Sequence, residues 1–374
     1  MDEVSRGSRV SSERPSVSVL LQRGQNNLDL IRLLAAIGVM FGHSFYIQPA
    51  QGRHEPIARL IGIEYSGSLA VYTFFLISGM LVTNSFIRQQ STFRFAAHRI
   101  ARVFPGLIVC VFISAYALYP MFSNLTVSEV IASKDSAQYF ARGITFYPDI
   151  LYTLPHIFEN APLKNSVNGS LWTIPVELKC YLIVLLAGCI GLLRSKFSST
   201  VFIATCGAFL GWMIFNGSPY SFLHDYVTKA PDYSFYPVVF FLIGMLLYSM
   251  RETITIDGRL GIALIALYAL FAHSMVGSVL FYVAFVYGVL CIAADTRISA
   301  LRPKSDYSYG VYLWAFPIQQ IFASLYPKMD NLLGLMLSIP VTLVMAALSW
   351  HLIERPCIIW CRSMLDEKRT TLRA

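Results

Sequence analysis

Apolar residues occur along this chain in long runs that short polar segments separate. Most runs approach the roughly 20 apolar residues that a helix needs to cross a bilayer. The seventh is short and leads almost directly into the eighth, so a hairpin or re-entrant pair is an alternative there. The pattern predicts an all-α, polytopic membrane protein with about ten transmembrane helices. The predicted spans are 29–48, 67–87, 103–120, 171–193, 198–215, 233–250, 260–273, 275–294, 307–326 and 332–353.

The segments outside the spans suggest a simple division of the chain. Residues 1–27 are polar, Ser-rich and basic and precede no signal-peptide cleavage site, which predicts a disordered cytoplasmic tail. Residues 28–356 form the predicted transmembrane domain, and 357–374 a cytoplasmic C-terminal tail. Residues 121–170 combine mixed charge with several aromatic residues, so we expect a partly structured cap on the other side.

Composition agrees with a membrane location. The chain is 56% hydrophobic and only 13% charged, with a mean hydropathy of +0.57. Soluble domains carry nearer a quarter of charged residues, so a soluble globule is excluded. The seven cysteines are scattered, without a CxxC pair or a histidine at metal-ligand spacing, and predict neither a metal site nor a disulfide framework.

The net charge of +8 could indicate nucleic acid or an anionic membrane surface, so the distribution of basic residues has to decide. With ten spans, 20 Lys and Arg residues lie on the side of the termini and 7 on the opposite side. Cytoplasmic loops carry the excess of basic residues, which predicts that both termini are cytoplasmic. The same asymmetry explains the charge without nucleic acid.

The first span carries Arg32 and His43, two ionisable residues that are costly in a membrane. Eleven residues at about 100° each return to nearly the same face, so the two lie in one stripe about 16 Å apart. Asp29 lies one turn before Arg32 on nearly the same face. Lipid could not solvate this stripe, which predicts that it faces a cavity or the protein interior. The alternative is that Arg32 snorkels to the interface and His43 bonds a neighbouring helix.

Glu177 is a further ionisable residue, about five residues after Trp172, which we expect at the membrane interface. The fourth span enters from the non-cytoplasmic side, which predicts a depth for Glu177 similar to that of His43. Such a pair would orient the imidazole and raise its basicity, as general-base catalysis requires. The alternative is a structural pairing of Glu177 with Lys179 or another helix.

Arg99 and Arg102 precede the third span on one helical face, which suits phosphate binding, although positive-inside topology alone also predicts basic residues there. Ser78 and Gly79 form a small pair within the second span, a pattern more typical of close helix packing than of nucleophilic catalysis.

Taken in order, these segments resemble the membrane-bound acyltransferase-3 superfamily over roughly residues 26 to 357. Two positions depart from the family pattern: His98 stands where a second arginine is frequent, and Ala315 where a histidine often follows Leu-Trp. The second departure indicates that any catalytic histidine here is His43. The matching motifs are Leu28-Asp29-Leu30-Ile31-Arg32 followed by His43, Phe74-Phe75-Leu76-Ile77-Ser78-Gly79, Arg99-Ile100-Ala101-Arg102-Val103-Phe104-Pro105, Asn168-Gly169-Ser170-Leu171-Trp172-Thr173 with Glu177 and Tyr181, Ser308-Tyr309-Gly310-Val311-Tyr312-Leu313-Trp314, and Ile353-Glu354-Arg355-Pro356.

The resemblance implies a bacterial inner-membrane O-acyltransferase that moves an acyl group, expected to be acetyl, from cytoplasmic acyl-CoA to a glycan hydroxyl. An exopolysaccharide, an O-antigen or a lipo-oligosaccharide would be the acceptor. Membrane lipids would surround the protein. A glycolipid flippase with a proton relay, or an acyltransferase for a non-glycan small molecule, are the alternatives.

The resemblance also suggests roles for individual residues. Catalysis would rest on His43, Glu177 and Arg32. His43, oriented by Glu177 or Asp29, would act as the general base or carry the acyl group, and these two roles stay open. The donor would contact four residues: Arg99, Arg102, Asp29 and Ser78.

Overall fold

The computed structural model describes residues 15–22, 24, 26–49, 54–89, 91–215, 237–272 and 274–371. This part of the chain is helical and contains no β-strand, only two isolated β-bridges. The longer helices are α2 (Leu28–Ile47), α4 (Ser66–Gln89), α5 (Thr92–Ile113), α8 (Lys134–Thr145), α9 (Thr173–Cys189), α10 (Lys196–Phe215), α12 (Pro237–Ser249), α13 (Gly258–Phe271), α14 (Met275–Ala294), α15 (Ser308–Leu325), α16 (Asn331–Ser349) and α17 (Arg355–Thr371). The short elements are α1 (Val17–Leu20), α3 (Pro56–Ile61), α6 (Tyr119–Phe122), α7 (Val127–Ala132), the 3₁₀ turns η2 (Gly169–Trp172) and η3 (Thr296–Leu301), and the π-helical turns η1 (Ser114–Leu118) and η4 (Trp350–Glu354).

Each predicted span coincides with a helix where the chain is described, although residues 233–236 and 273 lie outside that part. Six helices of the described part are long and apolar enough to cross a membrane, which supports a multi-pass membrane protein. The number ten and the side of the termini stay predictions. The six are Leu28–Ile47, Ser66–Gln89, Thr92–Phe122, Gly169–Cys189, Met275–Ala294 and Asn331–Asp366.

The helix α5 begins eleven residues before the predicted third span. Ser91 caps it by accepting a hydrogen bond from the Arg94 backbone N–H, as an N-cap serine commonly does. The basic segment from Arg94 to Arg102 is therefore helical and continuous with the apolar part of α5. The hydropathy window missed this extension because charged residues interrupt it.

The predicted disordered tail is wrong for the residues before α2 that the structure describes. The helix α1 within it is buried, with Val17 and Leu20 both fully covered. The backbone N–H groups of Val17 and Ser18 donate to the carbonyls of Ile254 and Arg251. Burial of these apolar side chains and pairing of the backbone hold the segment against the bundle, which composition alone did not indicate.

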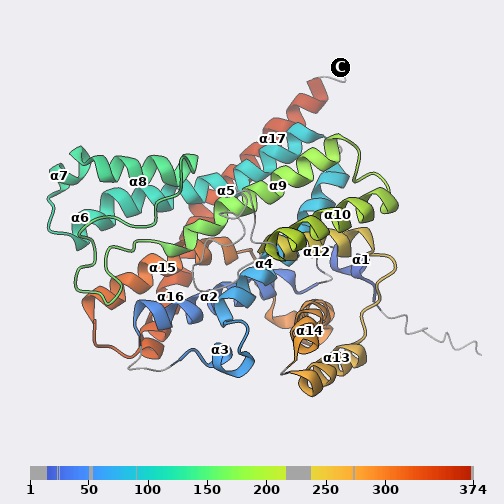
Figure 1. The fold of residues 1–374 in the computed structure, drawn as a ribbon. Helices are drawn as coiled ribbons and strands as arrows, with labels where there is room; N and C mark the ends of the chain where they lie inside the picture. Colours follow the sequence, from blue (N-terminus) through green and yellow to red (C-terminus); the bar gives the residue numbers. More distant parts are fainter. Residues whose placement is uncertain are drawn as a thin grey trace, which may run out of the picture.

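The helices form one bundle with two distinguishable ends (Figure 1). We call the end where α2 begins the inner end, which is cytoplasmic if the charge distribution predicts the topology correctly. The end where α2 finishes is the outer end. The helices α2, α15 and α16 pack together, α4 packs against α12 and α2, and α17 packs along α5. The helices α6, α7 and α8 form the predicted cap at the outer end (Figure 1).

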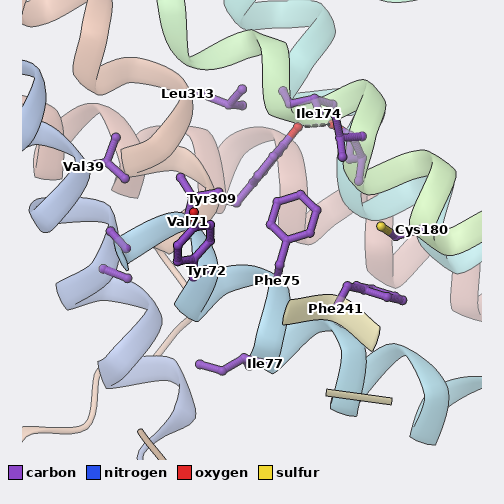
Figure 2. Packing of buried hydrophobic residues seen from close by; sticks show 14 of the residues in the cluster. Val39, Val71, Tyr72, Phe75, Ile77, Ile174, Cys180, Phe241, Tyr309 and Leu313 are labelled. Carbon is purple, nitrogen blue, oxygen red and sulfur yellow. Dashed lines mark hydrogen bonds between the residues drawn. The ribbon is translucent and has the colours of Figure 1, made fainter. Parts of the chain in front are cut away.

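The helices α4 and α12 approach each other most closely at two glycines, Gly79 and Gly244. A Cβ atom on Gly79 would lie 2.1 Å from the carbonyl oxygen of Phe241, and one on Gly244 would lie 2.2 Å from that of Leu76. Figure 2 shows the surrounding core, with side chains from both helices. Gly79 therefore serves close helix packing, the structural reading of the small pair in the second span.

The variant Gly79→Ala should destabilise the protein by about 1–3 kcal/mol, because the added methyl group overlaps a backbone atom that cannot move alone. Thermal unfolding in detergent measures the effect. Gly288→Ala is the matched control, since a Cβ at that position of α14 meets nothing within 4 Å. Equal melting temperatures for the two variants would contradict the packing role of Gly79.

Candidate functional site

A small cavity lies inside the bundle, between α2, α4, α5, α9 and α15. Its volume of about 50 Å³ is large enough for a few water molecules. Polar and aromatic side chains line it together, which is unusual for the interior of a membrane protein. The lining residues are Arg32, Val71, Phe74, Phe75, Ser78, Arg102, Val103, Thr173, Ile174, Glu177, Tyr181, Tyr309 and Tyr312.

An ion-pair network holds the inner wall of this cavity. One oxygen of Asp306 accepts from both arginines, from Arg32 at 2.5 Å and from Arg102 at 2.6 Å. The second arm of Arg102 donates to Glu354 at 3.2 Å. The Glu354 side chain is only 1% exposed and accepts a further bond from Ser349 at 2.8 Å. Each charge in this network therefore has an opposite charge within hydrogen-bond distance, as burial requires.

Local structure prepares both carboxylates for this role. Asp306 stands just before α15 and accepts from the backbone N–H and hydroxyl of Ser308 with its other oxygen. Burial raises the pKa of the Asp306 carboxyl, but Arg32, Arg102 and the Ser308 bonds outweigh it, so the pKa lies well below its usual range. Glu354 ends the π-helical turn η4, a geometry that recurs at functional sites.

Glu177 lies in the same cavity and bonds differently from the prediction. Its Oε1 accepts from the hydroxyl of Tyr181, one turn later on α9, and from that of Ser78 at 3.5 Å. In the described part of the chain it forms no hydrogen bond with His43. The expected His43–Glu177 pair is therefore wrong for this structure.

Glu177 and His43 do not lie at the same depth in the bundle, and the reason is found in α15. Pro317 has no N–H, so the carbonyl of Leu313 loses its helical partner. Asn168, which is fully buried, donates to this carbonyl at 2.9 Å, and the thiol of Cys110 also approaches it. These contacts draw the turn before α9 into the protein, rather than leaving it at the interface.

Gly169, next in the chain, packs on the ring of Phe316, which in turn contacts His43. Eight residues separate Gly169 from Glu177, which corresponds to about 12 Å along a helix. Glu177 therefore lies further towards the inner end than His43 does.

His43 lies near the end of α2, at the outer end, but it does not line the cavity. Its ring meets the ring of Phe316 edge to face, with centroids 5.2 Å apart. The Nδ1 atom is buried without a hydrogen-bond partner. The helix α2 carries both members of the predicted stripe, but only Arg32 reaches the cavity.

Arg99 and Arg102 differ more than the sequence suggested. The guanidinium of Arg99 lies over the rings of Phe95 and Tyr181, at 5.9 and 5.7 Å. No carboxylate forms an ion pair with Arg99 among the residues that the structure describes, and its Nε is buried without a partner. Arg102 is held by two carboxylates, whereas the sequence grouped it with Arg99 as a pair that binds the donor phosphates.

Of the two remaining predicted donor contacts, Ser78 lines the cavity. Asp29 is exposed and lies outside the set of cavity-lining residues, so the expectation that it contacts the donor or His43 gains no support from this geometry.

Asp306 is the site residue that sequence reasoning missed. It lies outside every apolar run, and an acidic residue in a polar segment does not indicate a functional site. The available signal was its position two residues before the Ser308-to-Trp314 motif, with Arg32 lacking an evident counter-charge. Glu354 belonged to a recognised motif, but nothing in the sequence indicated its partner.

Fold and site together define a multi-pass membrane protein with a charged cavity inside its helical bundle. A comparison with protein families matches residues 25–353 to the acyltransferase domain of the acyltransferase-3 family. The chain belongs to this family and is a membrane O-acyltransferase, which removes the flippase alternative.

Two curated relatives are similar along nearly their whole length. An O-acetyl transferase of Shigella phage Sf6 is 29% identical over 353 residues, which cover 88% of this chain and 95% of the relative. Nodulation protein 10 of Rhizobium leguminosarum bv. viciae is 28% identical over 368 residues, 89% of this chain and 93% of the relative. No solved structure matches this chain.

Proposed function

We propose that the enzyme transfers an acetyl group from acetyl-CoA to a hydroxyl of a glycan, in the inner membrane of a bacterium. The observation that carries the donor assignment is Arg99, a half-buried arginine at the inner end whose Nε is buried without a partner and which forms no ion pair with a carboxylate in the described chain. The phage relative, named an O-acetyl transferase, supports the acyl group. A glycan acceptor fits a site whose histidine lies at the outer end.

The donor is expected to enter from the inner end. Arg32, Arg99 and Arg102 face three carboxylates, Asp306, Glu177 and Glu354, so the cluster is formally neutral. Only Arg99 can accept the negative charge of a phosphate without giving up an ion pair. We therefore propose that Arg99 binds the CoA phosphates. Arg32 and Arg102 instead hold Asp306 in position.

The reaction joins the two ends of the site. The acceptor oxygen attacks the thioester carbonyl, the new C–O ester bond forms, and the C–S bond breaks. His43 takes the hydroxyl proton and then returns it to the leaving CoA thiolate, so that CoA departs as the free thiol and the imidazole is regenerated. The extended pantetheine arm is comparable in length to the roughly 16 Å between Arg32 and His43.

The cavity ends at Tyr312, one turn short of Phe316. The hydroxyl of Tyr312 bonds Thr173 at 2.6 Å and the carbonyl of Ser170 at 2.9 Å. The thioester has to pass these aromatic rings to reach His43. We therefore expect the rings to turn when the donor binds.

Mass spectrometry tests the proposal on surface glycans and lipids from cells with and without the gene. A mass difference of one acetyl group on a glycan is the expected result. Purified enzyme with [¹⁴C]acetyl-CoA and glycan fractions from the gene-less cells should reproduce the transfer. A label found only on a non-glycan small molecule, or no label at all, would contradict the proposed acceptor or the proposed donor.

The variant Arg99→Met should raise the KM for acetyl-CoA by at least about tenfold, the size of one charge-assisted contact. Its kcat at saturating donor should change little. Arg94→Met is the matched control on the same helix, since Arg94 bonds the Leu365 carbonyl at 2.6 Å and Asp366 at 3.5 Å. An unchanged acetyl-CoA KM in Arg99→Met would remove Arg99 from the donor site.

A further inference from the structure

Three buried polar atoms without partners lie around the outer end of α2. They are Nδ1 of His43, the side-chain oxygen Oε1 of Gln319 and the side-chain oxygen Oδ1 of Asn331. They come from α2, α15 and α16, which pack against one another (Figure 1). A buried polar atom normally has a partner, so three at one helix junction require an explanation.

Gln319 is held in a definite orientation. Its Nε2 donates to the carbonyl of Met40 at 2.9 Å, and since a carbonyl can only accept, the amide nitrogen has to face it. Gln319 follows Phe316 by three residues on α15, and Met40 precedes His43 by three on α2. Phe316 contacts His43, so the amide of Gln319 lies in the same helix junction as the histidine ring. The Gln319 side chain is 3% exposed, and its oxygen is left without a donor.

Asn331 reaches the same region from α16. It is fully buried, and its Nδ2 donates to the hydroxyl of Ser44 at 3.5 Å, while that hydroxyl donates to the carbonyl of Phe41. Ser44 is the residue after His43. The amide oxygen of Asn331 is thereby left, like that of Gln319, as an unused acceptor beside the outer part of α2.

The chemistry of the three atoms is uniform. Two are amide oxygens, which only accept, and the third is an imidazole nitrogen, which accepts in the tautomer protonated at Nε2. Groups of this kind are complementary to a ligand with several O–H donors. We infer that Gln319, with Asn331, forms the acceptor subsite beside His43 and binds hydroxyl groups of a polyhydroxylated acceptor.

This inference rests on the proposed function, since it requires that the acceptor reach His43 from the outer end. It adds that Gln319 contacts the acceptor and not the donor. The Met40 carbonyl keeps its place in the helical ladder of α2 when Gln319 is replaced, so the fold loses little. The expected loss therefore falls on the affinity for the acceptor.

The test uses full-length enzyme in detergent with [¹⁴C]acetyl-CoA and the glycan fraction that the wild-type enzyme labels. Gln319→Met keeps the side-chain length and removes the amide. Its KM for the glycan fraction should rise at least tenfold, while its KM for acetyl-CoA stays within about twofold. Gln320→Met is the matched control. Gln320 is also buried and its Oε1 also lacks a partner, but its Nε2 donates to the carbonyls of Leu163 and Ser166 in the cap loop and not to α2.

A second variant covers the case in which Gln319→Met does not accumulate. Gln319→Glu keeps an acceptor oxygen and, as the protonated acid, can still donate to the Met40 carbonyl, so its KM for the glycan fraction should stay within about threefold of wild type. An unchanged glycan KM in Gln319→Met, an equal rise in Gln320→Met, or a tenfold rise in Gln319→Glu would overturn the assignment. If the wild-type enzyme labels no glycan fraction, the proposed function fails and the inference with it.

Discussion

Replacing His43 with alanine should lower acyl transfer by about 10²–10⁴-fold, the contribution of a positioned general base. The protein should still reach the membrane at the wild-type level, because Nδ1 of His43 makes no hydrogen bond that the fold would lose. The measurement is the transfer of label from [¹⁴C]acetyl-CoA to glycan, normalised to the amount of enzyme in the membrane. An active His43→Ala enzyme would exclude the mechanism.

Two further measurements sharpen this result. His156→Ala is the control, since His156 is an exposed histidine of the cap loop that pairs with Glu159; it should keep full activity. Rapid quenching of wild-type enzyme with labelled donor and no acceptor separates the two roles of His43. Label on the protein that His43→Ala lacks would indicate an acyl carrier, whereas unlabelled protein supports the general base.

Replacing Asp306 with asparagine should produce the largest loss of stability of any single change at the site. Asp306 compensates two guanidinium groups at once, those of Arg32 and Arg102. Breaking a buried ion pair from one side costs about 3–5 kcal/mol, because the remaining charge stays buried. The side chain of Asp306 is 16% exposed, so we expect the lower part of this range. Thermal unfolding in detergent measures it, and activity should fall as well, since both arginines line the cavity.

Two comparison variants test whether the lost ion pairs cause the destabilisation of Asp306→Asn. Asp366→Asn removes an exposed carboxylate that lies 3.5 Å from Arg94, a type of pair that contributes at most about 1 kcal/mol. Glu354→Gln should have an intermediate effect, since Arg102 keeps its bond to Asp306. A melting temperature of Asp306→Asn equal to that of Asp366→Asn would show that the network does not stabilise the fold.

The sequence alone predicted the helices well and the residue pairs poorly. Hydropathy located α2 and α14 to within one residue, because uniform apolar runs end abruptly at polar residues. Helical periodicity also gave the stripe of Arg32 and His43. It could not show that the cavity stops between them, because the aromatic rings that close it come from α15.

The partners of the charged residues depend on distances that no local pattern contains. Asp306 is 274 residues from Arg32 in the chain, and Glu354 is 252 residues from Arg102. The depth of Glu177 was misjudged because it depends on Pro317, whose missing N–H frees a carbonyl for Asn168. A proline in one helix thus frees a carbonyl that binds the turn before another helix, and only the packed structure reveals this contact.

The separation between Arg32 and Asp306 also has a consequence for biosynthesis. Arg32 is translated 274 codons before its counter-ion Asp306, so α2 can meet the membrane before that counter-ion exists. At roughly 5–20 residues per second, the interval between the synthesis of Arg32 and that of Asp306 is on the order of 10–60 s. Arg32 is the fifth residue of α2, close enough to the helix end for its side chain to reach the headgroups during this interval. The position of this arginine at the start of its helix thus lets the first span insert before its partner exists.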